Sequence, residues 1–306
     1  MDFDKEFKIR RKEYPGHDKG LQVKETDGVV TLAAPLLEEQ TWLRHGFSTR
    51  LGGVSEGDCY SMNLGFGRES NEENVRENYR RIAGAVGFKP EDMVFTYQTH
   101  TNVVRKVTED DRGKGFARPR DYQDVDGLIT DVLGIALTIF AADCVPLLIA
   151  DKRLHVIGAS HSGWRGTIAD IGGETIRRMH EEYGTRAEDC VCVIGPSICG
   201  DCYEVSPDVG ERFREAYSGA LADMVCPVRE PDKCSEPTLK YSLNLWEACR
   251  QNFLRAGVPE EQILMTDICT CCNPELLFSH RASQGKRGAL AAFLQIQGQS
   301  VSDARR

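Results

Sequence analysis

The chain has 306 residues, of which 41% are hydrophobic and 28% are charged, and its net charge is −9 at pH 7. This length and composition are typical of a globular protein with a sizeable core, and the acidic balance without a basic stripe excludes general nucleic-acid binding. No uninterrupted apolar run of about 20 residues is present, so we expect no membrane span.

The first residues, 1–12, are charged and lack the apolar centre of a secretory signal. We therefore expect a cytoplasmic protein. We expect residues 1–39 to form an N-terminal lead-in with a strand around 29–32, residues 40–298 to form one main domain, and residues 299–306 to form a flexible tail. Nothing in the sequence specifies an oligomeric state.

The elements predicted along the main domain are strands and helices. A strand from His45 ends in the loop at Gly52-Gly53, where glycines permit a tight turn. The elements that follow are a helix over 71–86, strands over 93–97, 102–107, 125–130, 135–140, 145–150 and 154–159, a helix over 167–183, a strand over 190–194, helices over 207–217 and 242–256, and strands over 263–265 and 288–296. The pattern predicts an α+β fold: a single domain with mixed β-sheets flanked by helices.

The strands over 145–150 and 154–159 are separated only by Asp151-Lys152-Arg153, which predicts a buried β-hairpin. Cys144 enters the first arm and His161 leaves the second. In an antiparallel pair, the start of one strand lies opposite the end of the other. We therefore expect the thiol of Cys144 and the imidazole of His161 to lie close together, as candidates for chemistry.

A third candidate is His100, which sits at a bend between two predicted strands. A histidine is more often a surface or hydrogen-bonded core residue than a ligand, and a buried cysteine is usually a small hydrophobe. However, His100, Cys144 and His161 all lie at strand ends beside glycines or polar turns, where a scaffold can hold a site open. This placement favours a shared site.

Several motifs of the chain occur in one known family. They are 45–50 (HGFSTR), 98–100 (QTH), 142–146 (ADCVP), 161–166 (HSGWRG), 195–198 (GPSI), 202–205 (CYEV) and 278–281 (FSHR). In this set and order, over roughly residues 40–296, the chain closely resembles the polyphenol-oxidase or laccase-domain family, also called YfiH-like. The resemblance implies a catalytic domain whose fold is shared with a bacterial toxin deamidase. It also implies purine nucleoside phosphorylase activity with adenosine deaminase as a side activity.

The resemblance further implies that His100, Cys144 and His161 bind one zinc ion as the catalytic centre. Two imidazoles and one thiolate suit zinc, and three protein ligands leave a fourth position for water or substrate. The same donors suit copper, which stays the alternative metal, with a laccase-like polyphenol oxidase as the alternative activity. The seven histidines of the chain do not readily supply the ligands of a multicopper oxidase.

A phosphorylase must bind inorganic phosphate and a purine nucleoside: adenosine, inosine, guanosine or 5′-methylthioadenosine. We expect Arg50 and Arg165 to contact phosphate or ribose, because a guanidinium matches phosphate oxygens, although a surface salt bridge stays open for both. Ser48 and Asn63 are expected to add hydrogen bonds to the substrate.

For deamination, zinc would lower the pKa of its bound water. The glutamate that follows the zinc-binding histidine in the familiar deaminases is replaced by Thr101, which comes after His100. Asp143 is a guess for the proton shuttle.

Two further classes remain open. Cys144 as nucleophile with His161 as base would make a metal-free cysteine hydrolase or deamidase, which thiol alkylation of metal-free protein would inactivate. A non-enzymatic metal-binding protein would contain zinc without turning over nucleosides.

The remaining cysteines raise the question of a second metal site. Cys199 and Cys202, together with Cys269, Cys271 and Cys272, have spacings typical of metal knuckles. In the family that the chain resembles, thiols at the positions of Cys202 and Cys269 occur without a known metal. Reduced structural thiols are therefore the favoured interpretation of this group.

Overall fold

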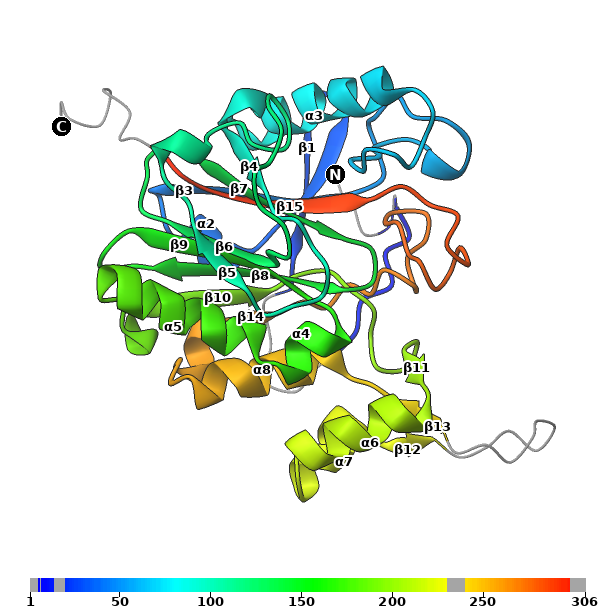
Figure 1. The fold of residues 1–306 in the computed structure, drawn as a ribbon. Helices are drawn as coiled ribbons and strands as arrows, with labels where there is room; N and C mark the ends of the chain where they lie inside the picture. The colour runs from blue at the N-terminus through cyan, green and yellow to red at the C-terminus, as the bar shows by residue number, and fades with distance from the viewer. Residues whose placement is uncertain (1–4, 6, 14–19, 230–239, 298–306) are drawn as a thin grey trace.

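The computed structural model describes residues 5, 7–13, 20–229 and 240–297, in which two six-stranded sheets pack face to face (Figure 1). The first sheet has the order β1 (Gln22–Thr26), β2 (Val29–Ala33), β3 (Leu43–Ser48), β15 (Leu290–Ile296), β7 (Ala136–Ala141), β4 (Met93–Phe95). The second has the order β14 (Ile263–Met265), β10 (Cys190–Ile194), β8 (Val145–Asp151), β9 (Val156–Ser162), β6 (Gly127–Thr130), β5 (Val104–Lys106).

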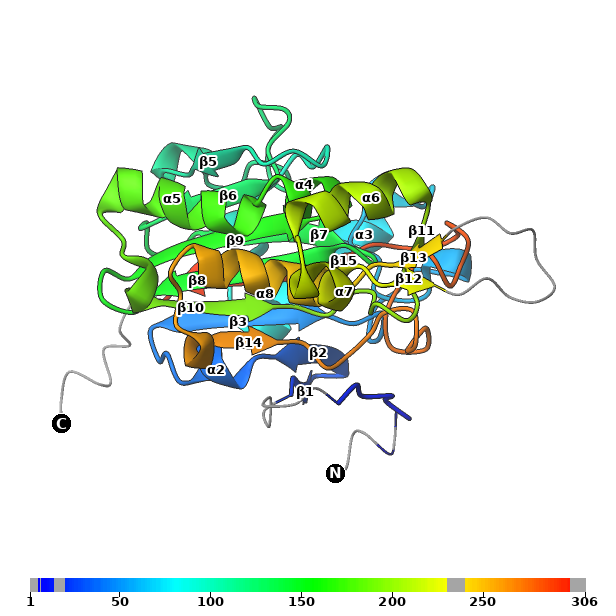
Figure 2. The same ribbon diagram turned by 90° about the horizontal axis from the view of Figure 1, so that it is seen from below.

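Helices cover the outer faces of the two sheets. The helix α3 (Glu72–Val86) packs on the first sheet, and α5 (Ile171–Tyr183) and α8 (Leu245–Arg255) pack on the second (Figure 2). A small third sheet contains β11 (Glu204–Val205), β13 (Lys240–Ser242) and β12 (Val228–Arg229). The short helices are α2 (Pro35–Glu38), α4 (Trp164–Ile168), α6 (Pro207–Ala216) and α7 (Ala220–Val225), with 3₁₀ turns at Gly57–Cys59, Pro90–Asp92, Glu109–Asp111, Ala187–Asp189 and Glu260–Gln262.

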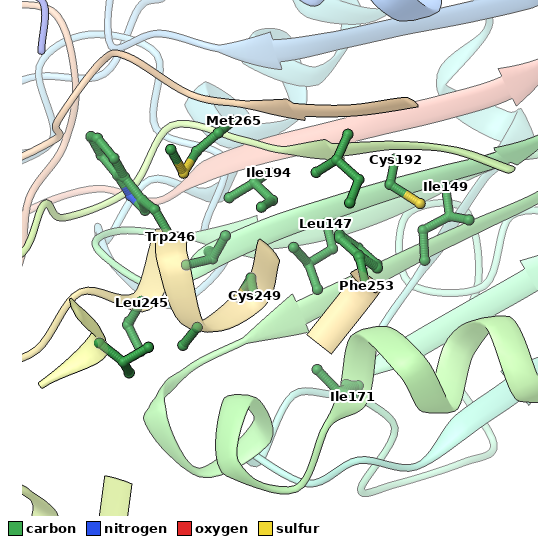
Figure 3. Close-up of a cluster of buried hydrophobic side chains, with 14 of the residues drawn as sticks. Leu147, Ile149, Ile171, Cys192, Ile194, Leu245, Trp246, Cys249, Phe253 and Met265 are labelled. Atoms are coloured by element: carbon green, nitrogen blue, oxygen red, sulfur yellow. The ribbon is translucent and has the colours of Figure 1, made fainter. Parts of the chain in front are cut away.

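The strand β8 shows why the central strands are apolar throughout. Successive side chains of a strand point to opposite faces of the sheet. Leu148 enters the core between the two sheets, whereas Leu147 and Ile149 pack under α5 and α8 with Trp246 and Phe253 (Figure 3). Because both faces of the sheet are covered, the strand has no position where a polar residue would reach water.

The predicted fold class is confirmed: one domain of mixed sheets flanked by helices. The β8–β9 hairpin forms as expected, but its turn is longer. Asp151 ends β8, and its side chain accepts hydrogen bonds from the backbone N–H groups of Arg153 and Leu154 at 2.8 and 2.9 Å. These bonds hold the turn, so β9 begins only at Val156.

Two predicted helices have different limits. The helix expected over 167–183 is broken, because Asp170 adopts a left-handed conformation (φ 53°) and its carboxylate caps Gly173 N–H at 3.0 Å. The helix expected over 242–256 is shorter at its start. Asn244 is its cap and accepts a hydrogen bond from the N–H of Glu247, while Ser242 ends β13.

Part of the expected lead-in joins the first sheet. β1 pairs with β2, and β2 pairs with β3. β2 is buried along its whole length, consistent with the apolar run at 29–32. The boundary at residues 39 and 40 stays a prediction, and the tail expected over 299–306 lies outside the described residues. No helix in the described residues is long and apolar enough to cross a membrane.

Candidate metal centre

The hairpin of β8 and β9 brings Cys144 and His161 together. Pro146 pairs with His161, and Cys144 directly precedes β8. The third residue, His100, lies in the loop after β4, where it adopts a left-handed conformation (φ 67°). The ligand atoms of His100, Cys144 and His161 all lie within 4.8 Å of one another, and Cys144 Sγ is 4.0 Å from His100 Nε2. The predicted grouping of these three residues is therefore present in the fold.

A buried carboxylate holds the two histidine segments. Asp126, next to β6, is fully buried, and its Oδ1 lies 2.7 Å from Nδ1 of His161. A carboxylate can only accept here, so Nδ1 carries the proton and Nε2 of His161 is left for a metal. The same carboxylate accepts hydrogen bonds from the backbone N–H groups of Thr99, His100 and Thr101, at 3.0 to 3.1 Å. Asp126 therefore positions both imidazoles, a role that the sequence analysis missed.

A glycine keeps the centre of the cluster free. A Cβ atom on Gly163 would lie 2.6 Å from Cδ2 of His100 and 3.2 Å from Sγ of Cys144. Only glycine leaves this volume open. The side chains also form a gradient of exposure, since His161 is buried, Cys144 is half-buried and His100 is exposed. Two nitrogens and one sulfur around a space that is open on one side fit a zinc or copper ion with a free coordination position.

The charges of the cluster are coupled. Burial alone would raise the pKa of Cys144, but the neighbouring His161 and His100 outweigh it and lower this pKa to about 6. Burial alone would lower the pKa of His161, but Cys144 and Asp126 outweigh it and raise this pKa to about 9. Without a metal, the pair is therefore a thiolate beside an imidazolium.

Asp143, the guessed proton shuttle, is tied to two neighbouring segments. It adopts a left-handed conformation (φ 87°) directly before Cys144. Its Oδ1 accepts a hydrogen bond from Thr270 Oγ1 at 2.7 Å, and its Oδ2 accepts one from the backbone N–H of Arg281 at 2.6 Å. Both oxygens of Asp143 thus serve to fix the turn that presents Cys144.

Three of the expected substrate-binding residues form hydrogen bonds to other parts of the protein. Ser48 Oγ accepts a hydrogen bond from Ala291 N–H, and the Asn63 amide bonds to Gly65, Glu69 and Ala289. The Arg50 guanidinium donates to the carbonyl groups of Tyr60 and Pro274, both at 2.8 Å. No hydrogen bond links Ser48, Arg50 or Asn63 to the His–Cys–His cluster in the part of the chain that the structure describes.

The fourth expected residue, Arg165, is exposed in α4 and stacks over the ring of Trp164 at 4.3 Å. Burial raises the pKa of Tyr203 to about 12, the charge of Cys144 raises it as well, and the charge of Arg165 lowers it. Arg165 comes two residues after Gly163, which borders the cluster, so it lies beside the cluster in the chain.

A further arginine near Cys144 was missed by the sequence analysis. Burial lowers the pKa of Arg287, the nearby Arg68 lowers it further, and Asp143 and Cys144 act in the opposite direction. Nε of Arg287 is buried without a hydrogen-bond partner. The sequence signal that could have found it is a basic pair, Lys286-Arg287, between two glycines just before the last strand.

Comparison with known proteins agrees with the fold. The family model described as multi-copper polyphenol oxidoreductase laccase matches residues 44–297. This match covers the second sheet, the first sheet apart from β1 and β2, and all three cluster residues, so the chain belongs to that family.

The similar proteins are named purine nucleoside phosphorylases, whereas the family model is described as a laccase. The chain is 36% identical over 258 residues to the purine nucleoside phosphorylase YlmD of Bacillus subtilis, covering 82% of this chain and 88% of that protein. It is 37% identical over 256 residues to the purine nucleoside phosphorylase of Bacteroides thetaiotaomicron, covering 83% and 92%. The crystal structure of YlmD from Geobacillus stearothermophilus matches with a TM-score of 0.80 at 33% identity, covering 92% of this chain and all of that one. These relatives support an enzymatic role for the chain.

Proposed function

We propose that the chain is a zinc-dependent purine nucleoside phosphorylase. The observation that carries this proposal is the cluster of His100, Cys144 and His161, which offers three ligands around a space that is open on the His100 side. The names of the relatives support the reaction class. Zinc is favoured over copper because a three-ligand site of imidazole and thiolate with an open position is typical of catalytic zinc. A cytoplasmic location stays a prediction.

Several residues of the chain would position the ligands of the proposed zinc ion. Zinc, when bound, supplies a Lewis acid that polarises a substrate oxygen or activates water at neutral pH. Asp126 keeps the proton of His161 on Nδ1, so that Nε2 faces the centre. Thr270 and Arg281 hold Asp143, which fixes the direction of the Cys144 side chain. These bonds set the geometry before substrate arrives, which lowers the cost of reaching the transition state.

The arginines near Cys144 are proposed to bind phosphate. Burial lowers the pKa of Arg287 and the charge of Arg68 lowers it further, and the buried Nε of Arg287 has no hydrogen-bond partner. Like charges held together favour an anion between them, and a guanidinium matches phosphate oxygens. Arg165 is retained as a candidate for phosphate or ribose. Arg50, Ser48 and Asn63 stay predictions as substrate-binding residues. In the structure, Ser48 joins β3 to β15, and Arg50 and Asn63 bond to neighbouring loop residues.

In the proposed reaction, a phosphate oxygen forms a bond to C1′ of the ribose while the bond from C1′ to the purine nitrogen breaks. The products are a free base, which takes up a proton, and ribose 1-phosphate or, from 5′-methylthioadenosine, methylthioribose 1-phosphate. Adenosine, inosine, guanosine and 5′-methylthioadenosine are all proposed as substrates. Deamination of adenosine to inosine at the same centre is proposed as a side activity.

The test is product analysis of adenosine and inosine incubations with and without phosphate. We expect base and ribose 1-phosphate only when phosphate is present, and no turnover by Cys144→Ala. Inosine formed from adenosine without phosphate, in the absence of phosphorolysis, would make deamination the main activity. A protein that carries zinc and turns over neither nucleoside would leave a metal-binding protein and overturn the proposal.

A metal-free cysteine hydrolase is the second candidate, and one observation favours it. The pKa of Cys144 lies at about 6 and that of His161 at about 9, which is the thiolate and imidazolium pairing of a cysteine nucleophile. The two candidates differ in what metal does. Added zinc would activate the phosphorylase and block the hydrolase, whereas alkylation of Cys144 in metal-free protein would abolish only an activity that needs no metal.

A further inference from the structure

A second group of ligand atoms lies outside the proposed active site. It consists of Cys199 and Cys202, which follow β10, and Cys269 and Cys272, which follow β14. β10 and β14 are parallel neighbours, so their carboxyl ends reach the same edge of the sheet. A bridge between Ser197 and Cys269 extends this pairing, with Thr270 N–H donating to Ser197 O at 3.0 Å. The fold therefore brings two pairs of cysteines, which are about 70 residues apart in the chain, into one cluster.

The spacing of the sulfurs fits one metal ion. All four Sγ atoms lie within 4.8 Å of one another, and those of Cys202 and Cys272 are 3.5 Å apart. Zinc–sulfur bonds of about 2.3 Å in a tetrahedron place neighbouring sulfurs about 3.8 Å apart. An iron–sulfur cluster puts several irons and sulfides between its thiolates and holds them farther apart. The arrangement is that of a single-ion centre.

Backbone groups already point at the cluster. The N–H groups of Cys199 and Cys272 donate to Sγ of Cys269 at 3.2 and 3.4 Å. The second of these bonds joins the two ends of the 269–272 turn. Backbone N–H donors of this kind stabilise a cysteine sulfur in its metal-bound, thiolate form. At the rim, Lys12 and Asp201, which lies between Cys199 and Cys202, form an ion pair at 2.8 Å.

The cluster is closed, unlike the centre at Cys144. Cys199 and Cys269 are 1% and 0% exposed, and Cys202 and Cys272 are half-buried. Four cysteine sulfurs that converge in a largely buried place are the ligand set of a closed, structural zinc site. We propose that Cys199, Cys202, Cys269 and Cys272 bind one zinc ion as a structural site. This inference goes beyond the proposed function and does not depend on it.

The proposed zinc would also support the turn that presents Cys144. Thr270 lies inside the second cysteine pair and donates to Asp143, directly before Cys144. Arg281 adds a second link, because its backbone N–H bonds to Asp143 and its side chain donates to the carbonyl group of Cys202 at 3.2 Å. An ion that fixes both cysteine pairs would thus fix the surroundings of Asp143.

The test counts metal ions and thiolate ligands in the full chain. Zinc is measured by elemental analysis in wild type, in Cys144→Ser, and in the double variant Cys202→Ser with Cys272→Ser. Cys271→Ser is the matched control, because Cys271 lies in the same loop but its sulfur is outside the group of four. Each protein is also loaded with cobalt, whose charge-transfer absorption grows with the number of bound thiolates.

We expect about two zinc ions per chain in wild type and in Cys271→Ser, and about one in Cys144→Ser. Cys144→Ser should still show the strong cobalt absorption of four thiolates. The double variant should lose that absorption. If the double variant does not fold, Cys144→Ser still decides. Any one of four results would overturn the assignment. They are a Cys144→Ser protein without zinc, a wild-type cobalt spectrum of only one thiolate, two disulfides among the four cysteines, and iron in place of zinc.

Discussion

The two clusters of ligand side chains differ in the number of ligands, in their exposure and in what holds them. The first takes His100, Cys144 and His161 from three separate segments and is exposed on the His100 side. The second takes four cysteines from two loops at one sheet edge, and all four are buried or half-buried. Zinc sites with three protein ligands keep a position for substrate, while sites with four do not. This difference underlies the two proposals, catalysis at the open cluster and a structural cross-link at the closed one.

The largest expected effect comes from filling the open centre. In Gly163→Ala, the new Cβ would lie 2.6 Å from His100 and 3.2 Å from Cys144, so the ligands must move apart. We expect phosphorolysis to fall about 100-fold or more, since displacements near 1 Å cost that much. Zinc at the four cysteines should remain, which elemental analysis checks. Gly84→Ala in α3 is the control, because nothing lies within 4 Å of its Cβ position. Equal activity of both variants would contradict the proposed centre.

A smaller effect is expected from the carboxylate behind His161. Asp126→Asn retains the size of the side chain but removes the charge that holds the proton on Nδ1 of His161. Loss of such a partner weakens metal binding about 10- to 100-fold. A zinc competition titration measures this. Asp124→Asn is the matched control, because Asp124 bonds to the side chain of Thr99 and not to His161. An unchanged affinity in Asp126→Asn would show that the carboxylate does not tune the site.

Phosphate binding should respond more modestly. Arg287→Gln removes one of two neighbouring guanidinium groups and keeps a polar side chain. Losing one charge-assisted contact of about 1.4 kcal/mol raises the KM for phosphate about 10-fold. The KM for the nucleoside should change less, and both come from initial rates. A variant with an unaltered phosphate KM would remove Arg287 from the proposed anion site.

The smallest effect concerns the fold that both clusters share. Burial lowers the pKa of His45 in β3 to about 4, and its Nε2 accepts a hydrogen bond from Ala34 N–H at 2.9 Å. The unfolded chain binds this proton near pH 6.5, so stability is complete above that pH and falls as the pH drops toward 4. The loss should be about 1 kcal/mol at about pH 5.5. Denaturant unfolding across this window measures it, and His45→Gln should flatten the dependence. A slope that persists in the variant would assign the acid sensitivity to other groups.

Contacts between residues that are near in the sequence could be predicted, whereas contacts that depend on the pairing of distant strands could not. The hairpin is local, so the approach of Cys144 to His161 followed from the antiparallel register. Asp126 could not be found in this way, because only the pairing of β6 with β9 places it behind His161. The closed cluster depends on the parallel pairing of β10 and β14, which a list of cysteine spacings does not contain. The break at Asp170 came from a side-chain cap that competes with helix continuation.

The measurement that tests the account most directly is a timed removal of metal. Wild-type protein is incubated with a chelator, and released zinc and remaining phosphorolysis are followed in the same samples. The open cluster has three ligands and is exposed on the His100 side, whereas the closed one has four ligands, two of them fully buried. We therefore expect the open cluster to lose its zinc first, so that activity vanishes when about one of two zinc ions has left and returns when zinc is added back. Activity that falls in strict proportion to total zinc until both ions are gone, or that survives the loss of all zinc, would contradict the division into a catalytic and a structural site.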